Sequence, residues 1–209
     1  MKKLSILLVF FLISNAYASD LFEAAEEGDI QRTEMMIEAK VNVDSKNEEG
    51  ETALMKASLH GHSDIVKLLI DNNANVNLKN KVNWTALIYA SGVCRSGIVK
   101  LLIEKKADVN VKTKDFGFTA LMLASAEERC FEVVQLLLEA KANVNDKNIS
   151  GSTALMNAAY NGNVEIAKIL IEAKANINVK NSEGETALMK AAKEGHREVF
   201  DLLKAAGAK

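Results

Sequence analysis

The tetrapeptide Thr52-Ala53-Leu54-Met55 returns four more times along the chain, unchanged or with isoleucine in its last place. The copies begin at Thr85, Thr119, Thr153 and Thr186, which gives intervals of 33, 34, 34 and 33 residues. A nearly constant period of this length is typical of stacked-repeat proteins. Such stacks present an extended surface to their partners. The period therefore favours protein recognition over catalysis as the first hypothesis about function.

The segment 50–79 predicts two helices and a loop in each repeat. Thr52 can cap a short first helix that ends near Gly61, because threonine favours the start of a helix and glycine its end. From Asp64 onwards apolar residues follow at helical spacing, which predicts a second helix. A polar stretch then leads to the next threonine. One such unit cannot bury its apolar face alone, so we predict an all-α solenoid in which neighbouring units make the core.

Several short motifs recur around the tetrapeptide. They are Gly50-x-Thr52-Ala53-Leu54, Ala57-Ser58, Gly61-His62, Asp64-Ile65-Val66-Lys67-Leu68-Leu69 and Ala74-Asn75-Val76-Asn77, with near copies such as Gly184-Glu185-Thr186-Ala187-Leu188. With these motifs the chain resembles the ankyrin repeat family over residues 20–209. The resemblance implies an L-shaped stack of helix pairs, with β-hairpin-like loops at right angles to the helices.

We expect one elongated domain, residues 19–209, built from six units. A capping unit spans about residues 20–49, four inner repeats span about 50–82, 83–116, 117–150 and 151–183, and a closing cap spans about 184–209. The ends support this division. Lys204 stands where inner repeats have isoleucine or leucine, and Arg32 and Thr33 stand in the places of Ile65 and Val66. Polar outer faces are what terminal repeats require.

Two departures from the family pattern bear on stability. The resemblance implies a histidine in the last place of the tetrapeptide, but this chain has methionine or isoleucine there, so apolar packing replaces a side-chain hydrogen bond. The glycine that ends the second helix is replaced by Lys40, Asn73, Lys106, Lys141 and Lys174. A side chain in a left-handed cap costs on the order of 1 kcal/mol, so we expect lower stability than in an idealised repeat.

The first residues of the chain predict export. Met1-Lys2-Lys3 precedes an apolar run from Leu4 to Ile13 and the segment Ala16-Tyr17-Ala18, which is the pattern of a signal peptide cleaved after Ala18. The alternative is a buried N-terminal helix. The run is too short to remain as a membrane span. We therefore expect residues 1–18 to be removed and the mature protein to be soluble, in the periplasm or outside the cell, with no stable membrane insertion.

The two cysteines mark an irregular place in the repeat. Cys94 stands where other repeats have the glycine between their helices, and Cys130 lies in the same turn one repeat later, where Glu127-Glu128-Arg129 carries one extra residue. In an exported protein this predicts a Cys94–Cys130 disulfide. Neighbouring helices lie about 8–10 Å apart, so the irregular turns must bring the two chains closer. The alternatives are two buried thiols or, less favoured, a metal site.

We found no group of residues that predicts catalysis, a cofactor or a metal. His62 and His196 follow the turn glycine as the family pattern implies, so we interpret them as structural, and His60 with His62 would make a weak metal site. The sequence contains no nucleophile elbow, phosphate-binding glycine loop or zinc-protease motif. The net charge without residues 1–18 is about −4, which argues against a nucleic-acid partner. We therefore predict that the protein is not an enzyme.

The resemblance places a partner-binding surface on the loop tips and on the exposed positions of each first helix. Carried over to this chain, the apolar residues on that surface are Leu59, Val82, Trp84, Tyr89, Phe116, Phe118, Leu123, Ile149 and Tyr160. Exposed aromatic side chains are frequent anchors at interfaces. We predict an apolar patch centred on Trp84, Phe116 and Phe118 between acidic end repeats. The alternative is that these three rings pack on one another and stiffen the loops.

These observations predict a non-enzymatic protein–protein interaction module that is exported and monomeric and that binds a protein partner through a concave groove. A second hypothesis is a structural or self-associating protein of the cell envelope. An enzyme or a small-ligand receptor would need a convergent polar pocket, which the sequence does not show.

Overall fold

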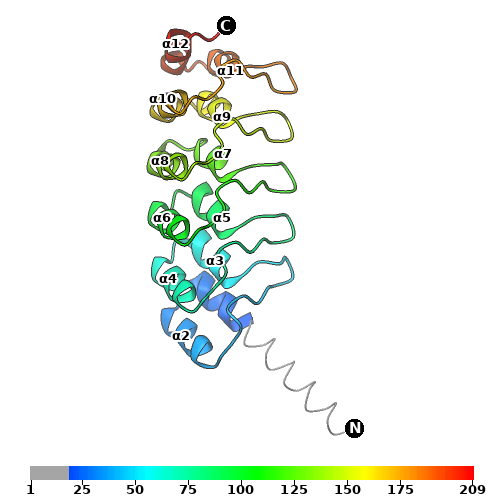
Figure 1. The fold of residues 1–209 in the computed structure, drawn as a ribbon, viewed down its shortest axis with the longest axis vertical. Coiled ribbons are helices and arrows are strands. Elements are labelled where there is room, and N and C mark those ends of the chain that lie inside the picture. Colours follow the sequence, from blue (N-terminus) through cyan, green and yellow to red (C-terminus); the bar gives the residue numbers. More distant parts are fainter. Residues whose placement is uncertain (1–18) are drawn as a thin grey trace.

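The computed structural model describes residues 19–209, which form six helix pairs stacked in chain order along one axis (Figure 1). We number these units 1 to 6. They are residues 19–27 with α2 (Ile30–Glu38), α3 (Ala53–His60) with α4 (Ser63–Asp71), α5 (Ala86–Gly92) with α6 (Ser96–Glu104), α7 (Ala120–Ala124) with α8 (Phe131–Glu139), α9 (Ala154–Asn161) with α10 (Val164–Glu172), and α11 (Ala187–Lys193) with α12 (Arg197–Ala205). The described residues contain no strand, which confirms the predicted all-α solenoid.

The predicted signal peptide, residues 1–18, lies outside the described residues. Within residues 19–209, every helix is too short or too polar to cross a membrane.

The tetrapeptide starts each first helix in the way the sequence predicts. Thr52 is the N-cap of α3, and its side-chain oxygen accepts a hydrogen bond from the backbone N–H of Met55 at 3.3 Å. The other four threonines cap their helices in the same way. Gly61 ends α3 with φ +87°, a left-handed conformation that glycine adopts without a steric penalty. Sequence and structure therefore agree on the limits of α3.

The second helices end on residues with side chains in the left-handed region, as predicted. The backbone φ angles lie between +59° and +68° at Lys40, Asn73, Lys106, Lys141 and Lys174. Each of these residues therefore carries a conformational cost that glycine would avoid.

The core runs through the stack between successive units. Met55, Ile88, Met122 and Met156 are almost fully buried because the next unit covers them. The equivalent Met189 is 47% exposed, because no unit follows it among the described residues. One predicted cap position is wrong: Thr33 is buried, not on the outer face, and its hydroxyl is satisfied by donating to the Asp29 carbonyl oxygen at 2.7 Å.

The loops between units form hairpins that project from one side of the stack (Figure 1). Backbone hydrogen bonds join successive hairpins, from the N–H groups of Lys81, Lys114, Ile149 and Ser182 to the carbonyl oxygens of Glu49, Val82, Phe116 and Ser150, at 2.8–3.0 Å. In unit 3 the hairpin is closed by a hydrogen bond from the backbone N–H of Asn80 to the carbonyl oxygen of Trp84. The next hairpin is closed by the N–H of Thr113 and the carbonyl oxygen of Phe118, and it holds one more residue. This extra residue accounts for the 34-residue interval between Thr85 and Thr119.

A second set of hydrogen bonds joins successive units through the loops that follow the second helices. The side-chain oxygen of Asn77 accepts from the N–H of Asp108 at 2.8 Å, and Asn145 does the same for Asn176 at 2.7 Å. The amide nitrogen of Asn145 also donates to the carbonyl oxygen of Lys174 at 3.3 Å. The asparagines of the chain thus hold its units together through exposed loops.

A third set of bonds lies at the turn between the two helices, and we call it the turn tie. The residue before each second helix reaches back to a carbonyl oxygen of the preceding unit. His62 and His196 donate through Nε2 to the carbonyl oxygens of Glu26 and Tyr160, both at 2.9 Å. Both histidines are therefore structural, as predicted. The other two side chains of this kind are Arg95, which donates to His60 at 3.2 Å, and Asn163, which donates to Ser125 at 3.1 Å.

The disulfide replaces the turn tie between units 3 and 4. Cys130 occupies the position before α8 and is bonded to Cys94, with their Cα atoms 4.7 Å apart. Cys94 adopts φ +62° in the place of the turn glycine. Residues Glu128–Cys130 form a short 3-10 helix, and α7 is only five residues long. The irregular turn thus provides the close approach that the sequence interpretation required.

Candidate protein-binding groove

The floor of the predicted groove corresponds to the same two positions in each unit. The residue before each threonine lies on the hairpin, and the fourth residue after that threonine lies on the first helix. In unit 3 these residues are Trp84 and Tyr89, whose ring centroids are 4.8 Å apart. In unit 4 they are Phe118 and Leu123, which pack against the core. We call these four residues the groove floor.

Ion pairs occupy the same two positions in unit 2 and in unit 6, on either side of the groove floor. In unit 2 the Lys56 ammonium lies 3.0 Å from the Glu51 carboxylate, and in unit 6 Lys190 lies 2.8 Å from Glu185. Unit 5 has Ser152 and Asn157 at these positions. The groove is therefore apolar over units 3 and 4 and charged or polar beyond them.

Hydrogen bonds favour the ionised carboxylates of these two ion pairs. The Lys190 hydrogen bond, against a smaller effect of desolvation, lowers the pKa of Glu185 to about 2. Burial opposes ionisation of Glu51, but hydrogen bonds from Tyr89, Lys56 and Asn47 outweigh it and lower the pKa of Glu51. Burial and the bond to Glu51 raise the pKa of the Tyr89 hydroxyl, so this hydroxyl stays protonated at neutral pH.

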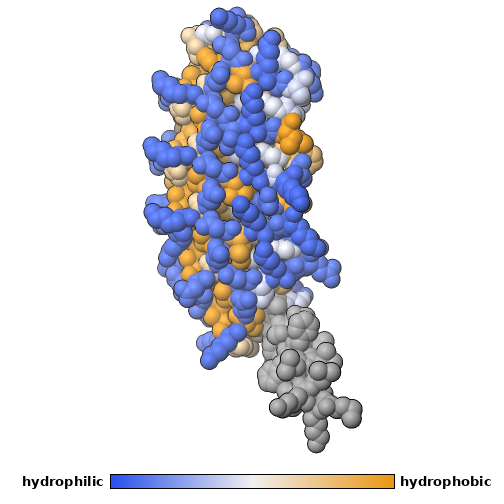
Figure 2. All heavy atoms as spheres, turned by 45° about the vertical axis from the view of Figure 1, so that its right-hand side comes forward, coloured by the Kyte–Doolittle hydropathy of each residue, from blue (hydrophilic) through white to orange (hydrophobic). Residues whose placement is uncertain are grey.

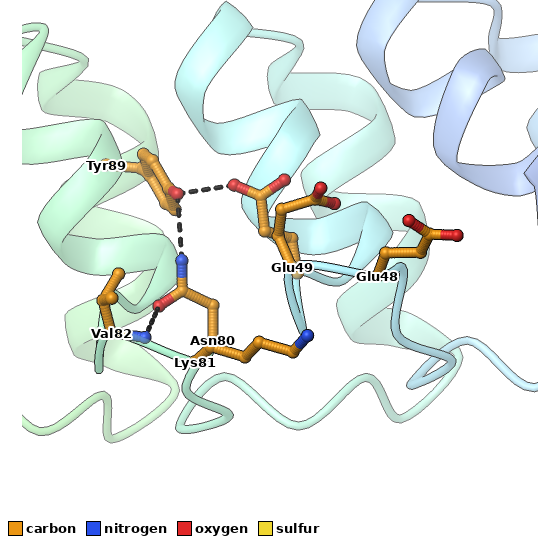
Figure 3. Close-up of a pocket in the computed structure, with 7 residues that line it drawn as sticks. Glu48, Glu49, Asn80, Lys81, Val82 and Tyr89 are labelled. Atoms are coloured by element: carbon orange, nitrogen blue, oxygen red, sulfur yellow. Dashed lines mark hydrogen bonds between the residues drawn. The ribbon is translucent and has the colours of Figure 1, made fainter.

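A hollow of about 440 Å³ opens between units 2 and 3 beside the groove floor (Figure 3). It is lined by Glu48, Glu49, Glu51, Asn80, Lys81, Val82 and Tyr89. The Tyr89 hydroxyl donates to Glu51 at 2.6 Å and accepts from the Asn80 amide at 3.2 Å. The Asn80 oxygen in turn accepts from the N–H groups of Val82 and Trp84. This network fixes the hairpin against the helix, so the wall of the hollow is preorganised.

The hairpin tips carry an exposed apolar strip. Val82, Phe116 and Ile149 lie on three successive hairpins and are 40%, 55% and 70% exposed. Backbone hydrogen bonds join their hairpins, and the Phe116 ring lies 5.7 Å from that of Phe118 on the floor. Hydrophobic atoms stand out among hydrophilic residues on this side of the molecule (Figure 2). We call Val82, Phe116 and Ile149 the hairpin patch.

The predicted surface residues divide into two groups in the structure. Val82, Phe116, Ile149 and Tyr160 are exposed. Leu59, Trp84, Tyr89, Phe118 and Leu123 are partly buried. Trp84 and Phe118 thus differ from the expectation of exposed loop tips, because each sits on the inner side of its hairpin and packs against the core.

The alternative interpretation, in which the three rings pack together, describes part of the arrangement. Phe116 packs on Phe118, whereas Trp84 packs on Tyr89.

The sequence did not predict the hydrogen bonds that Glu51 and Asn80 make within the site. A periodic pattern could have identified Asn80. Asn47, Asn80, Asn148 and Asn181 stand at the same place in their repeats, and each accepts hydrogen bonds from two hairpin N–H groups. The link between Glu51 and Tyr89 spans 38 residues and has no local sequence pattern.

Small residues stand next to the groove floor. One helical turn beyond the floor, units 3 and 4 have Gly92 and Ala126, whereas units 2 and 5 have Leu59 and Tyr160 in the equivalent places. A side chain on Gly92 would meet Leu123 at an ordinary contact distance of 3.6 Å, so packing does not require glycine there. The apolar floor is thus bounded by bulkier residues on both sides. Among residues 19–209, no three potential metal ligands come together.

Comparisons with known proteins agree with this architecture. Residues 21–113, 93–148 and 121–209 match the protein family described as ankyrin repeats in three copies. A chain of the solved complex between the predatory endopeptidase Bd0816 of Bdellovibrio bacteriovorus and the immunity protein Bd3460 superposes with a TM-score of 0.81 at 30% sequence identity. The match covers 89% of the present chain and 97% of the other. Among curated proteins none matches in sequence. Because the family match extends over nearly all of the described residues, the chain belongs to the ankyrin repeat family.

Proposed function

We propose that the protein is an exported, non-enzymatic binding module that holds a protein partner in the groove over units 3 and 4. The observation that carries this proposal is the exposure of the hairpin patch beside the apolar floor. Isolated apolar residues are normal on a protein surface, but three on adjacent, hydrogen-bonded hairpins next to aromatic rings form a surface of the kind that partners cover. The Glu51–Tyr89–Asn80 network keeps this surface rigid, which lowers the entropic cost of binding.

We further propose that the partner is a peptidase. The similar solved complex pairs an endopeptidase with an immunity protein, and the stack of helix pairs in the present chain is the architecture of a binding partner, not of a catalyst. A groove with an apolar floor and acidic residues at one side suits a folded protein surface that presents apolar and basic side chains together. The expected consequence of binding is inhibition of the peptidase.

The test is a capture experiment with residues 19–209 as bait. The site variant is Phe116→Ser/Ile149→Ser, since both side chains are exposed and their replacement should leave folding intact. The matched control is Met35→Ser, a 62% exposed side chain on α2. We expect wild type and control to capture a peptidase from envelope and secreted fractions and to inhibit it, while the site variant does neither. Equal capture by all three baits would remove the groove as the site.

Self-association remains a second candidate because of the end face of unit 6. Met189 is exposed there, and a hollow of about 260 Å³ is lined by Ala191, Ala192, Gly195, Arg197 and Phe200. Sedimentation velocity over a hundredfold concentration range decides between the two: a constant sedimentation coefficient excludes this candidate.

A further inference from the structure

The junction between units 3 and 4 differs from its neighbours in the chemistry of its turn tie. At the other junctions a histidine, arginine or asparagine side chain donates a hydrogen bond to the preceding unit. At this junction the same position is Cys130, and its connection to the preceding unit is the covalent bond to Cys94. The sulfur of Cys130 also lies 3.5 Å from the carbonyl oxygen of Ser91. Asn163 bonds the equivalent carbonyl, that of Ser125, one junction later.

Opening the disulfide therefore leaves this junction with a weaker tie than the others. A thiol is a poor hydrogen-bond donor compared with an amide or a guanidinium group. Each unit of a repeat array is stabilised mainly by its nearest neighbours, so a weak junction divides the array into two cooperative blocks. The blocks would be units 1–3 and units 4–6.

The same junction divides the groove floor. Trp84 and Tyr89 belong to unit 3, whereas Phe118 and Leu123 belong to unit 4. The hairpin patch is split in the same way, with Val82 before the junction and Phe116 after it. Figure 1 shows α5, which carries Tyr89, and α7, which carries Leu123, as neighbours in the stack. Cys94 follows Val93, the C-cap residue of α5. Relative movement of the two blocks would therefore separate the parts of the binding surface.

We propose that the Cys94–Cys130 disulfide is a redox-controlled coupling between the two halves of the groove, closed in the binding-competent protein and opened by a dithiol reductant. This inference rests on the proposed binding function and adds its regulation. Two electrons and two protons pass from the dithiol to the protein: the sulfur–sulfur bond breaks, two thiols form, and the dithiol becomes a disulfide. Cys94 is partly exposed and Cys130 fully buried, so the reductant attacks the Cys94 sulfur and Cys130 leaves as the thiolate.

The coupling can be tested without a partner. Trp84 is the single tryptophan and reports on unit 3 by fluorescence, whereas circular dichroism reports on all helices. In urea, the two probes should give the same midpoint for the oxidised protein and different midpoints for the reduced protein and for Cys94→Ser/Cys130→Ser. The matched variant Cys94→Gly/Cys130→Asn supplies the glycine and the amide found at other junctions, so its midpoints should coincide with or without reductant. Coincident, unshifted midpoints in the reduced wild type would overturn the coupling.

The regulation is tested by binding. With a captured partner, we expect reduced wild type and the serine variant to bind at least tenfold more weakly than oxidised wild type, and the Cys94→Gly/Cys130→Asn variant to bind equally well in both conditions. Equal affinity of oxidised and reduced wild type would overturn the regulation. If oxidised wild type binds no protein, the proposed function fails, and with it the regulation, while the urea midpoints still decide whether the disulfide couples the two blocks.

Discussion

At the scale of single residues, the units differ from one another at positions where the fold itself is the same. This lets one unit serve as the control for another. Lys106 follows the C-cap of α6 and has φ +67°, whereas Lys105, the C-cap residue, has φ −87°. The same side chain thus sits in a strained conformation at one position and in an ordinary one at the next.

We expect Lys106→Gly to raise the free energy of unfolding by about 0.5–1 kcal/mol, because glycine adopts the left-handed conformation without strain. The Asn77 bond to the Lys106 carbonyl oxygen is made to the backbone and is retained. Lys105→Gly is the control. It should lower the free energy of unfolding by a similar amount, because at a negative φ glycine relieves no strain and loses more conformational entropy on folding. Urea denaturation measures both, and a destabilised Lys106→Gly variant would contradict the interpretation of strain.

Ser58 offers a second comparison of this kind. The hydroxyls of Ser58 and Ser91 are buried without a hydrogen-bond partner among residues 19–209, whereas the Ser125 hydroxyl donates to the Leu121 carbonyl oxygen at 2.7 Å. Units 5 and 6 have alanine at this place, Ala159 and Ala192. Ser58→Ala should therefore stabilise the protein by about 1 kcal/mol, while Ser125→Ala should not. Equal effects of both substitutions on the urea midpoint would contradict the difference in hydrogen bonding between the Ser58 and Ser125 hydroxyls.

At the scale of elements, the bonds between hairpin, helix and loop decide how firmly each unit holds its neighbour. The Asn145 side chain accepts from the N–H of Asn176 and donates to the carbonyl oxygen of Lys174, so it binds two backbone groups in one turn of the next unit. At the first junction the Asp44 carboxylate accepts from the N–H of Asn75 at 2.9 Å but has no amide group to donate a second bond. The first junction thus shows that the accepted bond forms without the donated one.

Asn145→Ala should cost about 1–2 kcal/mol of unfolding free energy, because both bonds are lost. Asn145→Asp keeps the acceptor and should cost less than the alanine substitution. Thermal unfolding of the two variants gives the order, and an aspartate variant as unstable as the alanine variant would show that the donated bond carries the contribution.

The hairpin-to-helix ion pairs predict an acid-dependent loss of stability. The folded-state pKa of Glu185 is about 2, and that of Glu51 is also lowered, so folding favours the ionised carboxylates. Their contribution is present above the unfolded-state pKa, near 4.3, and is lost as the pH falls towards about 2. Glu185→Gln should flatten the fall in melting temperature across this range. Glu183→Gln is the control, since Glu183 is exposed and forms no ion pair within residues 19–209.

At the scale of the whole molecule, the position of a unit in the stack decides whether a following unit covers it. Met156 and Met189 occupy the same position in units 5 and 6, but the first is buried by the following unit and the second is exposed. The order of the units alone accounts for this difference.

Met156→Lys should cost about 3 kcal/mol or more, because it buries an unpaired charge, whereas Met189→Lys should cost less than about 1 kcal/mol. Urea denaturation at low and high protein concentration checks both. A large, concentration-dependent effect of Met189→Lys would show that another copy covers this face.

The repeat period predicted the helix pairs, the threonine caps, the left-handed helix ends and the site of the disulfide, because each depends on residues close in sequence or on a shared register. The sequence failed where the direction of a side chain decides. Trp84 and Phe118 were expected at the loop tips, but the hairpin turns them towards the core. Thr33 was expected outside, and an internal hydrogen bond allows it inside. The Glu51–Tyr89 bond joins two units, and the period carries no information about such pairs.

The turn ties also limit how this array can grow. Each unit supplies a side chain for the unit before it and a carbonyl oxygen for the unit after it, so a duplicated unit inserted at most junctions would find both partners in place. Between units 3 and 4, insertion of a unit that lacks these cysteines would place Cys94 and Cys130 two junctions apart, beyond the reach of a disulfide. The covalent bond therefore fixes these two units as neighbours, and a unit without a cysteine at these positions can be added only on either side of them.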